Sequence, residues 1–121
     1  MAAARGADVA VVVVGLDASY EEEDGDRVHR DNNMWSLPGP QAKLVDAVVE
    51  TGTPTVLVLI NGGPLAVLEP RGGALVEAFY GGQAAGEGLA AVLYGEVNPS
   101  GRMPVTAYAS EAQASSPSPS P

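Results

Sequence analysis

The sequence lacks cysteine, which excludes disulfide bridges and thiolate metal sites. It is also poor in basic residues, with 6 Lys and Arg against 15 Asp and Glu and a formal net charge of −9. Because nucleic-acid surfaces need clustered Lys and Arg, a nucleic-acid partner is disfavoured. Aromatic residues make up only 5% of the chain, and Ala and Val dominate its apolar residues. We therefore expect a core of small side chains that buries little area per residue.

Long hydrophobic runs are also missing. The valine run at 9–14 is too short to span a bilayer and carries no cleavage pattern. We therefore expect no membrane partner. Either the mature protein is soluble, or the true N-terminus lies upstream of Met1. With 121 residues, of which 45% are apolar, the chain is expected to form one domain or less and to need a partner domain.

Three apolar segments predict strands. The run Asp8–Val14 is a continuous stretch rich in β-branched valine, which is typical of a strand covered on both faces in a parallel sheet. Thr55–Ile60 is a second strand of the same kind. Ala74–Tyr80 fits a strand or a short helix, and the glycines that follow it favour the strand. Met103–Thr106 predicts a short final strand.

Two segments predict helices. The first should open at 36–39, with Ser36 as its cap and Pro38 near its first turn, and should end at 52–54. Its apolar stripe is Leu44, Val45, Val48 and Val49. The second helix is expected within 83–94, where apolar residues recur at helical spacing before a glycine.

This order of elements predicts an α/β fold with a parallel sheet. Right-handed crossovers would bring the exits of the strands to one edge, so that 21–26, 61–64 and 80–83 line the same side. We expect a folded unit over residues 1–109. The Ala, Ser and Pro of 110–121 cannot form a core and predict a disordered tail.

The segment Gly15–Arg27 follows the first strand, and five acidic residues lie between Glu21 and Asp26 within it. A run of acids is more often a solvated loop than a site. However, ligands of open α/β sheets bind at the carboxyl ends of the strands. Neighbouring carboxylates raise one another's pKa, so this cluster is chemically able to hold a proton donor near neutral pH.

Other motifs are weaker. Gly15-Leu16-Asp17 lacks the further glycines of a dinucleotide fingerprint. His29 is the only histidine, so a structural role is favoured over metal binding, and no metal site is expected. Trp35 fits a loop anchor better than a stacking platform. The turn at 61–64 fits a plain tight turn whether or not it also borders a site.

Several blocks together resemble the C-terminal α/β sandwich domain of glycoside hydrolase family 3, the β-glucosidases and β-xylosidases. In order, they are Ala-Asp-Val-Ala-Val-Val-Val-Val-Gly-Leu-Asp (7–17), Gly-Asp-Arg (25–27), Leu-Pro-Gly-Pro-Gln (37–41), Val-Leu-Val-Leu-Ile-Asn-Gly-Gly-Pro-Leu (56–65), Glu-Ala-Phe-Tyr-Gly-Gly-Gln (77–83) and Val-Leu-Tyr-Gly-Glu-Val-Asn-Pro-Ser-Gly-Arg-Met-Pro-Val-Thr (92–106). No single block is decisive, but all of them in this order are highly specific. The resemblance covers residues 7 to about 108.

The resemblance implies part of a three-layer α/β/α sandwich with a mostly parallel, flavodoxin-like sheet. It also implies a retaining glycosidase that hydrolyses terminal β-linked glucosides or xylosides without a cofactor. In the family, a glutamate shortly before the Asp-Arg pair is the general acid/base. The pattern Glu-x-Glu-Gly-x-Asp-Arg favours Glu23, then Glu21, then Glu22. Asp26 and Arg27 correspond to the pair that would bind substrate.

The departures from the family also shape the expectation. The family's nucleophile lies on a (β/α)8 barrel, which typically takes about 250 residues, so we expect that domain outside this chain. Phe79 stands where the family usually has Trp, and Val28–Trp35 looks like additional loop. The alternative function is a non-catalytic sugar-binding or structural remnant. For full-length members of the family, the resemblance implies an extracellular or secretory location.

Overall fold

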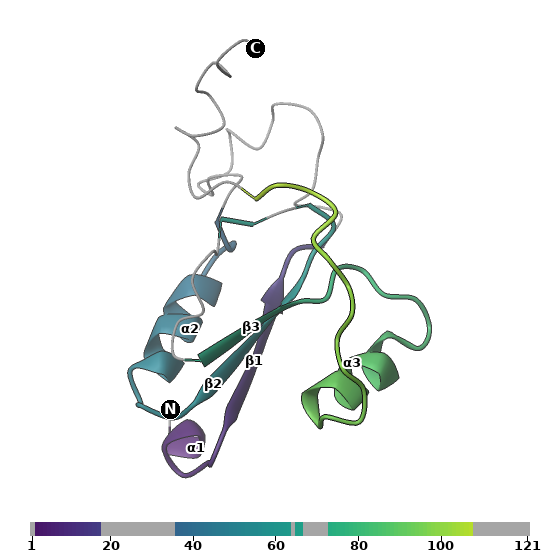
Figure 1. Ribbon diagram of the computed structural model, residues 1–121. Coiled ribbons are helices and arrows are strands. Elements are labelled where there is room, and N and C mark those ends of the chain that lie inside the picture. The colour runs from purple at the N-terminus through teal and green to yellow at the C-terminus, as the bar shows by residue number, and fades with distance from the viewer. Residues whose placement is uncertain (1, 18–35, 64, 67–72, 108–121) are drawn as a thin grey trace, which may run out of the picture.

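The computed structural model describes residues 2–17, 36–63, 65–66 and 73–107. A short helix, α1 (Ala2–Arg5), precedes strand β1 (Ala10–Gly15). The remaining elements are α2 (Gln41–Val49), β2 (Thr55–Ile60), β3 (Gly73–Glu77) and α3 (Ala85–Leu93). The strands form one parallel sheet in the order β1-β2-β3 (Figure 1). The predicted α/β class with a parallel sheet is therefore confirmed.

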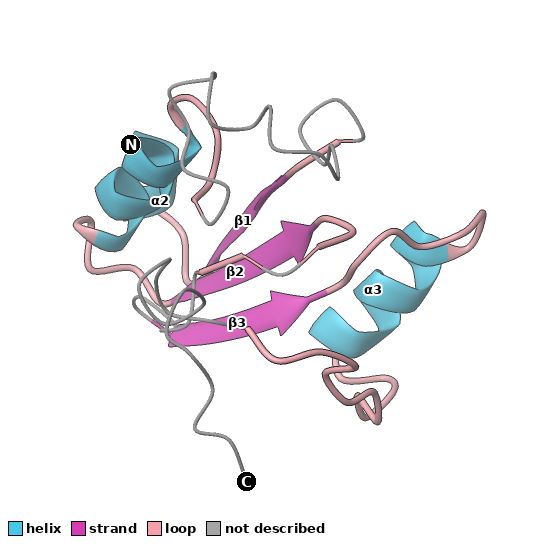
Figure 2. Cartoon of the chain, turned by 90° about the horizontal axis from the view of Figure 1, so that it is seen from above, coloured by secondary structure: helices cyan, strands magenta, loops and turns pink. Residues whose placement is uncertain are grey.

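The helices lie on opposite sides of the sheet, α2 on one and α3 on the other (Figures 1 and 2). This arrangement is part of a three-layer sandwich. The boundary predicted between a folded unit, 1–109, and a tail, 110–121, lies mostly outside the described residues and stays a prediction. No helix in the described ranges combines the length and the apolar character needed to cross a bilayer.

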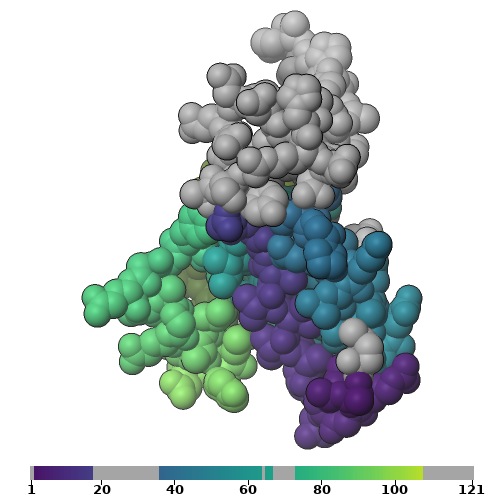
Figure 3. Space-filling view, turned by 180° about the vertical axis from the view of Figure 1, so that it is seen from behind, coloured from purple at the N-terminus to yellow at the C-terminus, as the bar shows by residue number. Residues whose placement is uncertain are grey.

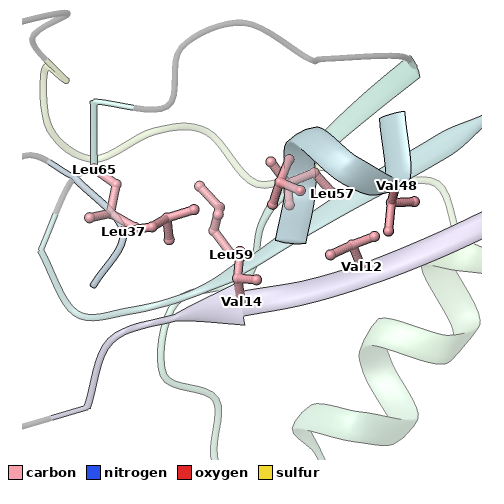
Figure 4. Packing of buried hydrophobic residues seen from close by; sticks show 8 residues of the cluster. Val12, Val14, Leu37, Val48, Leu57, Leu59 and Leu65 are labelled. Atoms are coloured by element: carbon pink, nitrogen blue, oxygen red, sulfur yellow. The ribbon is translucent and has the colours of Figure 1, made fainter. Parts of the chain in front are cut away.

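The core lies between α2 and the sheet. Alternate residues of β1 and β2 point toward α2, because side chains of a strand alternate between its faces. They meet the helix at Val45 and Val48, which are buried, while Leu37 and Leu65 close the end of the cluster near the strand exits (Figure 4). The strand members of this cluster are Val12, Val14, Leu57 and Leu59. Leu44, predicted to join them, is 45% exposed instead.

The second face of the sheet is covered unevenly. β2 is buried on both sides, since Leu57 and Val58 are both 0% exposed. β1 is not: Val11 is 50% and Val13 52% exposed, and β1 forms part of the molecular surface in Figure 3. The prediction that both faces of the first strand are covered was therefore wrong within the described residues. β1 is an edge strand of the described sheet, and its face away from α2 is the exposed one.

The first long helix begins later than its sequence predicts. α2 starts at Gln41 after Pro40, with no side-chain cap, so Ser36 is not the capping residue. The reason is Gly39, whose φ of 56° is left-handed and cannot be part of an α-helix. Leu37 is buried in the core instead of standing in a first helical turn. The predicted end is confirmed, because Gly52 has a φ of 78°.

The C-terminal half follows its prediction in part. Ala74–Tyr80 was expected to favour a strand, and β3 confirms this although it ends at Glu77. The second predicted helix is confirmed as α3, after which Gly95 has a φ of 76°. The final strand predicted at 103–106 is wrong, since these residues have no strand structure. Pro104 lacks the N–H that a sheet ladder needs.

Candidate functional site

The three strands end at one edge of the sheet, as expected for parallel strands. Gly15 pairs with Ile60, and Leu59 pairs with Glu77, so the last residues of β1, β2 and β3 lie side by side. This carboxyl edge is where open α/β sheets bind ligands. The predicted convergence of the strand exits is confirmed for 61–63 and 80–83, whereas 21–26 lie outside the described residues and their place at this edge stays a prediction.

The acidic segment begins at this edge. Gly15, Leu16 and Asp17 are its described residues, and Asp17 is exposed. The predicted site residues lie outside the described residues, as do His29 and Trp35, and their roles stay predictions. These site residues are Glu21, Glu22, Glu23, Asp26 and Arg27. The structure therefore describes where this segment starts and what holds its first residues.

Gly15 is held from two sides. Its N–H donates to Oε1 of Gln41 at 2.8 Å, and its carbonyl oxygen accepts from Nε2 of the same side chain at 3.0 Å. On the other side the backbone of β2 approaches so closely that a Cβ at Gly15 would overlap the carbonyl oxygen of Ile60. Only glycine fits here. The first residue of the segment is therefore fixed in position.

The backbone of Leu16 is also held by hydrogen bonds on two sides. Its N–H donates to the carbonyl oxygen of Ile60 at 2.9 Å, which extends the β1–β2 ladder by one residue. Its carbonyl oxygen accepts from the hydroxyl of Tyr80 at 3.0 Å. Tyr80 comes from the chain that follows β3. Residues 15 and 16 are thus bonded to α2, to β2 and to the exit of β3.

A buried amide and a carboxyl group lie together at the exits of β2 and β3. Asn61 is 0% exposed, and its Nδ2 donates to the carbonyl oxygen of Gly63 at 2.7 Å and to Oε2 of Glu77 at 3.5 Å. Its Oδ1 is buried and accepts no hydrogen bond within the described part of the chain. Phe79 donates its N–H to Oε1 of Glu77 at 3.3 Å. The turn at Phe79 has a φ of 51°, which is unusual for a residue with a side chain.

Burial raises the pKa of Glu77 above its usual 4.5. Two donors, the N–H of Phe79 and the side-chain amide of Asn61, oppose this rise because they stabilise the charged carboxylate. Burial has the larger effect. Glu77 is therefore a carboxyl group at the sheet edge that holds its proton to a higher pH than an exposed glutamate does.

The raised pKa predicts a pH-dependent difference between the protein and Glu77→Gln. A carboxyl group with a raised pKa binds more protons in the folded state than in the unfolded state, so it lowers stability as pH rises through the interval above 4.5. Glu77→Gln lacks this loss. The urea midpoint of Glu77→Gln minus that of the parent should therefore increase as the pH is raised from 4 to 8.

Glu87→Gln is the matched control, because that glutamate lies on the exposed surface of α3. A midpoint difference between Glu77→Gln and the parent that stays constant across this pH range would contradict the raised pKa.

Sequence reasoning missed two of these residues. Gln41 belongs to the block 37–41 that resembles the family, and Glu77 belongs to the block 77–83, but neither residue was predicted to have a role of its own. A signal existed for Glu77, which occupies the carboxyl end of a strand. Gln41 is separated from Gly15 by 26 residues, and no local pattern connects them. No group of His, Cys, Asp or Glu in the described ranges has a metal-binding arrangement.

Parallel strands with polar groups at their exits define an α/β domain, whose carboxyl edge is the position at which domains of this class bind ligands. The chain matches the model of the "Glycosyl hydrolase family 3 C-terminal domain" over residues 1–120, and it belongs to this family.

Among curated proteins, the chain is 43% identical over 113 residues to "Probable beta-D-xylosidase 6" of Arabidopsis thaliana, covering 89% of this chain and 14% of that protein. It is 45% identical over 105 residues to "Thermostable beta-glucosidase B" of Acetivibrio thermocellus, covering 86% of this chain and 13% of that protein. It is also 42% identical over 100 residues to "Probable beta-glucosidase J" of Neosartorya fischeri, covering 82% and 11%. The chain thus spans about a seventh of the length of the first two relatives and a smaller share of the third.

Proposed function

We propose that this chain supplies the general acid/base of a retaining β-glycosidase that acts on β-glucosides or β-xylosides. The nucleophile would be on a barrel domain outside these residues. The observation that carries the proposal is the fixed start of the acidic segment at the carboxyl edge of a parallel sheet. The relatives named β-xylosidase and β-glucosidase support this class of substrate.

The proposed reaction has two steps. In the first, the nucleophile's carboxylate attacks the anomeric carbon while Glu23 transfers its proton to the departing glycosidic oxygen. The C–O bond to the leaving group breaks, and a glycosyl–enzyme ester forms. In the second, the Glu23 carboxylate removes a proton from water, whose oxygen attacks the anomeric carbon and releases the sugar with its original configuration.

The proposal predicts that activity requires the chain and a barrel together. In a chimera, the matched 105 residues of "Thermostable beta-glucosidase B" would be replaced by the corresponding residues of this chain. We expect this chimera to hydrolyse 4-nitrophenyl β-glucoside or β-xyloside, and the isolated 121-residue chain to give no turnover. The assay follows release of 4-nitrophenolate.

Turnover by the isolated chain would contradict the division of the site between two domains. A folded chimera without activity would contradict the acid/base role. It would instead favour a structural or sugar-binding module, and binding of glucose or xylose, detected through Trp35 fluorescence, would separate these two.

A further inference from the structure

We propose that Gln41 is a positioning residue for proton transfer: its side-chain amide fixes the start of the segment that carries the acid/base. This inference rests on the proposed function and adds a residue to it. Gln41 lies on α2, 26 positions along the chain from the backbone that it contacts. It contributes no proton itself.

The contact of Gln41 with Gly15 imitates the pairing of a further strand. Ala10 and Leu16 direct their N–H groups to β2, so alternate residues of β1, including Gly15, direct theirs to the opposite edge. At that edge the Gln41 amide both donates to and accepts from Gly15. The other outward-facing residues, Val11 and Val13, receive no such bond from the described residues. The contact is therefore placed at the end of β1 from which the acidic segment departs.

The chemistry of this contact is specific to a primary amide. A glutamine side chain carries one carbonyl acceptor and one NH₂ donor in a plane, which matches the N–H and C=O of a strand edge. A carboxylate could accept from Gly15 N–H but could not donate to its carbonyl oxygen. An aliphatic side chain could do neither.

The contact is also rigid, because Gln41 is the first residue of α2 and this helix is anchored in the core by Val45 and Val48. Ile60 and Tyr80 hold Leu16 in the same way from β2 and from the exit of β3. Residues 15 and 16 are thus fixed from three directions, a few residues before Glu21. A proton donor must lie within hydrogen-bond reach of the leaving oxygen, and a misplacement of about 1 Å costs on the order of 100-fold in rate.

A merely structural contact would have a different signature. It would lower the folded fraction and reduce the rates of all substrates equally. A misplaced acid instead affects substrates according to their leaving group, because a 2,4-dinitrophenolate departs without protonation and an alkoxide does not. The leaving-group dependence therefore separates the two roles.

The test uses Gln41→Leu and Gln41→Glu in the chimera, with Ala42→Glu as the matched control. Ala42 is exposed on the same first turn, so its substitution adds a carboxylate without touching Gly15. For Gln41→Leu we expect kcat/KM on methyl β-glucoside to fall about 10- to 100-fold, and kcat/KM on 2,4-dinitrophenyl β-glucoside to change by less than about 3-fold. Gln41→Glu, which cannot donate, should show the same pattern, and Ala42→Glu should match the parent.

Hydrogen exchange on the 121-residue chain provides a readout that needs no activity. In Gln41→Leu the amide of Gly15 should exchange at least about 10-fold faster, while that of Leu57 in the centre of the sheet stays unchanged. Unchanged exchange at Gly15 would overturn the contact. Equal losses on both glucosides would overturn the positioning role. An inactive parent chimera would instead overturn the proposed function, and the catalytic consequence of Gln41 with it, while the exchange result still reports on the contact.

Discussion

Glu23→Gln in the chimera should lower kcat/KM for methyl β-glucoside about 100- to 10,000-fold, because glutamine cannot transfer a proton to the departing oxygen. With 2,4-dinitrophenyl β-glucoside the first step needs little protonation, so its loss should fall on the second step, in which water must be deprotonated. Steady-state kinetics on both glucosides measure the two effects.

Glu21→Gln and Glu22→Gln are the matched controls, since they remove the same charge from the same segment. Added azide should restore turnover of 2,4-dinitrophenyl β-glucoside only in the variant that has lost the acid/base. Azide is an anion, so it attacks the glycosyl–enzyme without needing a base. A selective loss in Glu21→Gln or Glu22→Gln would move the role to that residue. Three variants with parental activity would refute a role for this cluster in proton transfer.

The largest effect on folding is expected at the centre of β2. Leu57 is 0% exposed and packs in the cluster beneath α2. Leu57→Ala should lower the free energy of unfolding by about 2–5 kcal/mol, through lost burial and the cavity that remains. Urea denaturation followed by circular dichroism measures this change.

Two further variants make the test of Leu57 informative even if Leu57→Ala does not fold. Leu57→Met keeps the volume and should cost less than about 1.5 kcal/mol. Val13→Ala removes an aliphatic side chain from the exposed face of β1 and should change stability by less than about 0.5 kcal/mol. Equal losses for Leu57→Ala and Val13→Ala would refute the assignment of the core to the α2 side of the sheet.

The sequence was sufficient for features that depend on local patterns. The run Thr55–Ile60 was predicted with the bounds that β2 has, because a continuous apolar run between turn residues admits few alternatives. The ends of both long helices were also predicted, since Gly52 and Gly95 take left-handed backbone angles that stop a helix. Parallel pairing followed from the alternation of strands and helices.

Features that depend on distant neighbours were not predictable in the same way. Whether a face of β1 is exposed depends on which elements pack against that face. A run of valines is the same sequence in both cases, so it does not distinguish a strand covered on both faces from a strand covered on one. The predicted start of α2 was too early, because Ser36 is a good capping residue. The sequence around Gly39 does not show that this residue takes a left-handed backbone angle.

The site shows the same division. The carboxyl edge was predicted from topology, as was the exit of the acidic segment from it. The Gln41–Gly15 contact and the pairing of Asn61 with Glu77 were not, because each joins residues far apart in the chain through single side chains. Periodicity carries no information about such pairs. The order of preference among Glu23, Glu21 and Glu22 stays a prediction of the family pattern.

The register of the sheet has an evolutionary consequence. Ala10 pairs with Thr55 and Gly15 with Ile60, so the pairing of β1 with β2 closes the stretch of chain that contains the segment between Asp17 and Ser36. Doubling the length of a flexible loop costs only about 0.6 kcal/mol of closure entropy. Insertions or deletions in that segment would therefore leave the pairing of β1 with β2 almost unchanged in energy. The length of this segment can then change independently of selection on the stability of the sheet from which it departs.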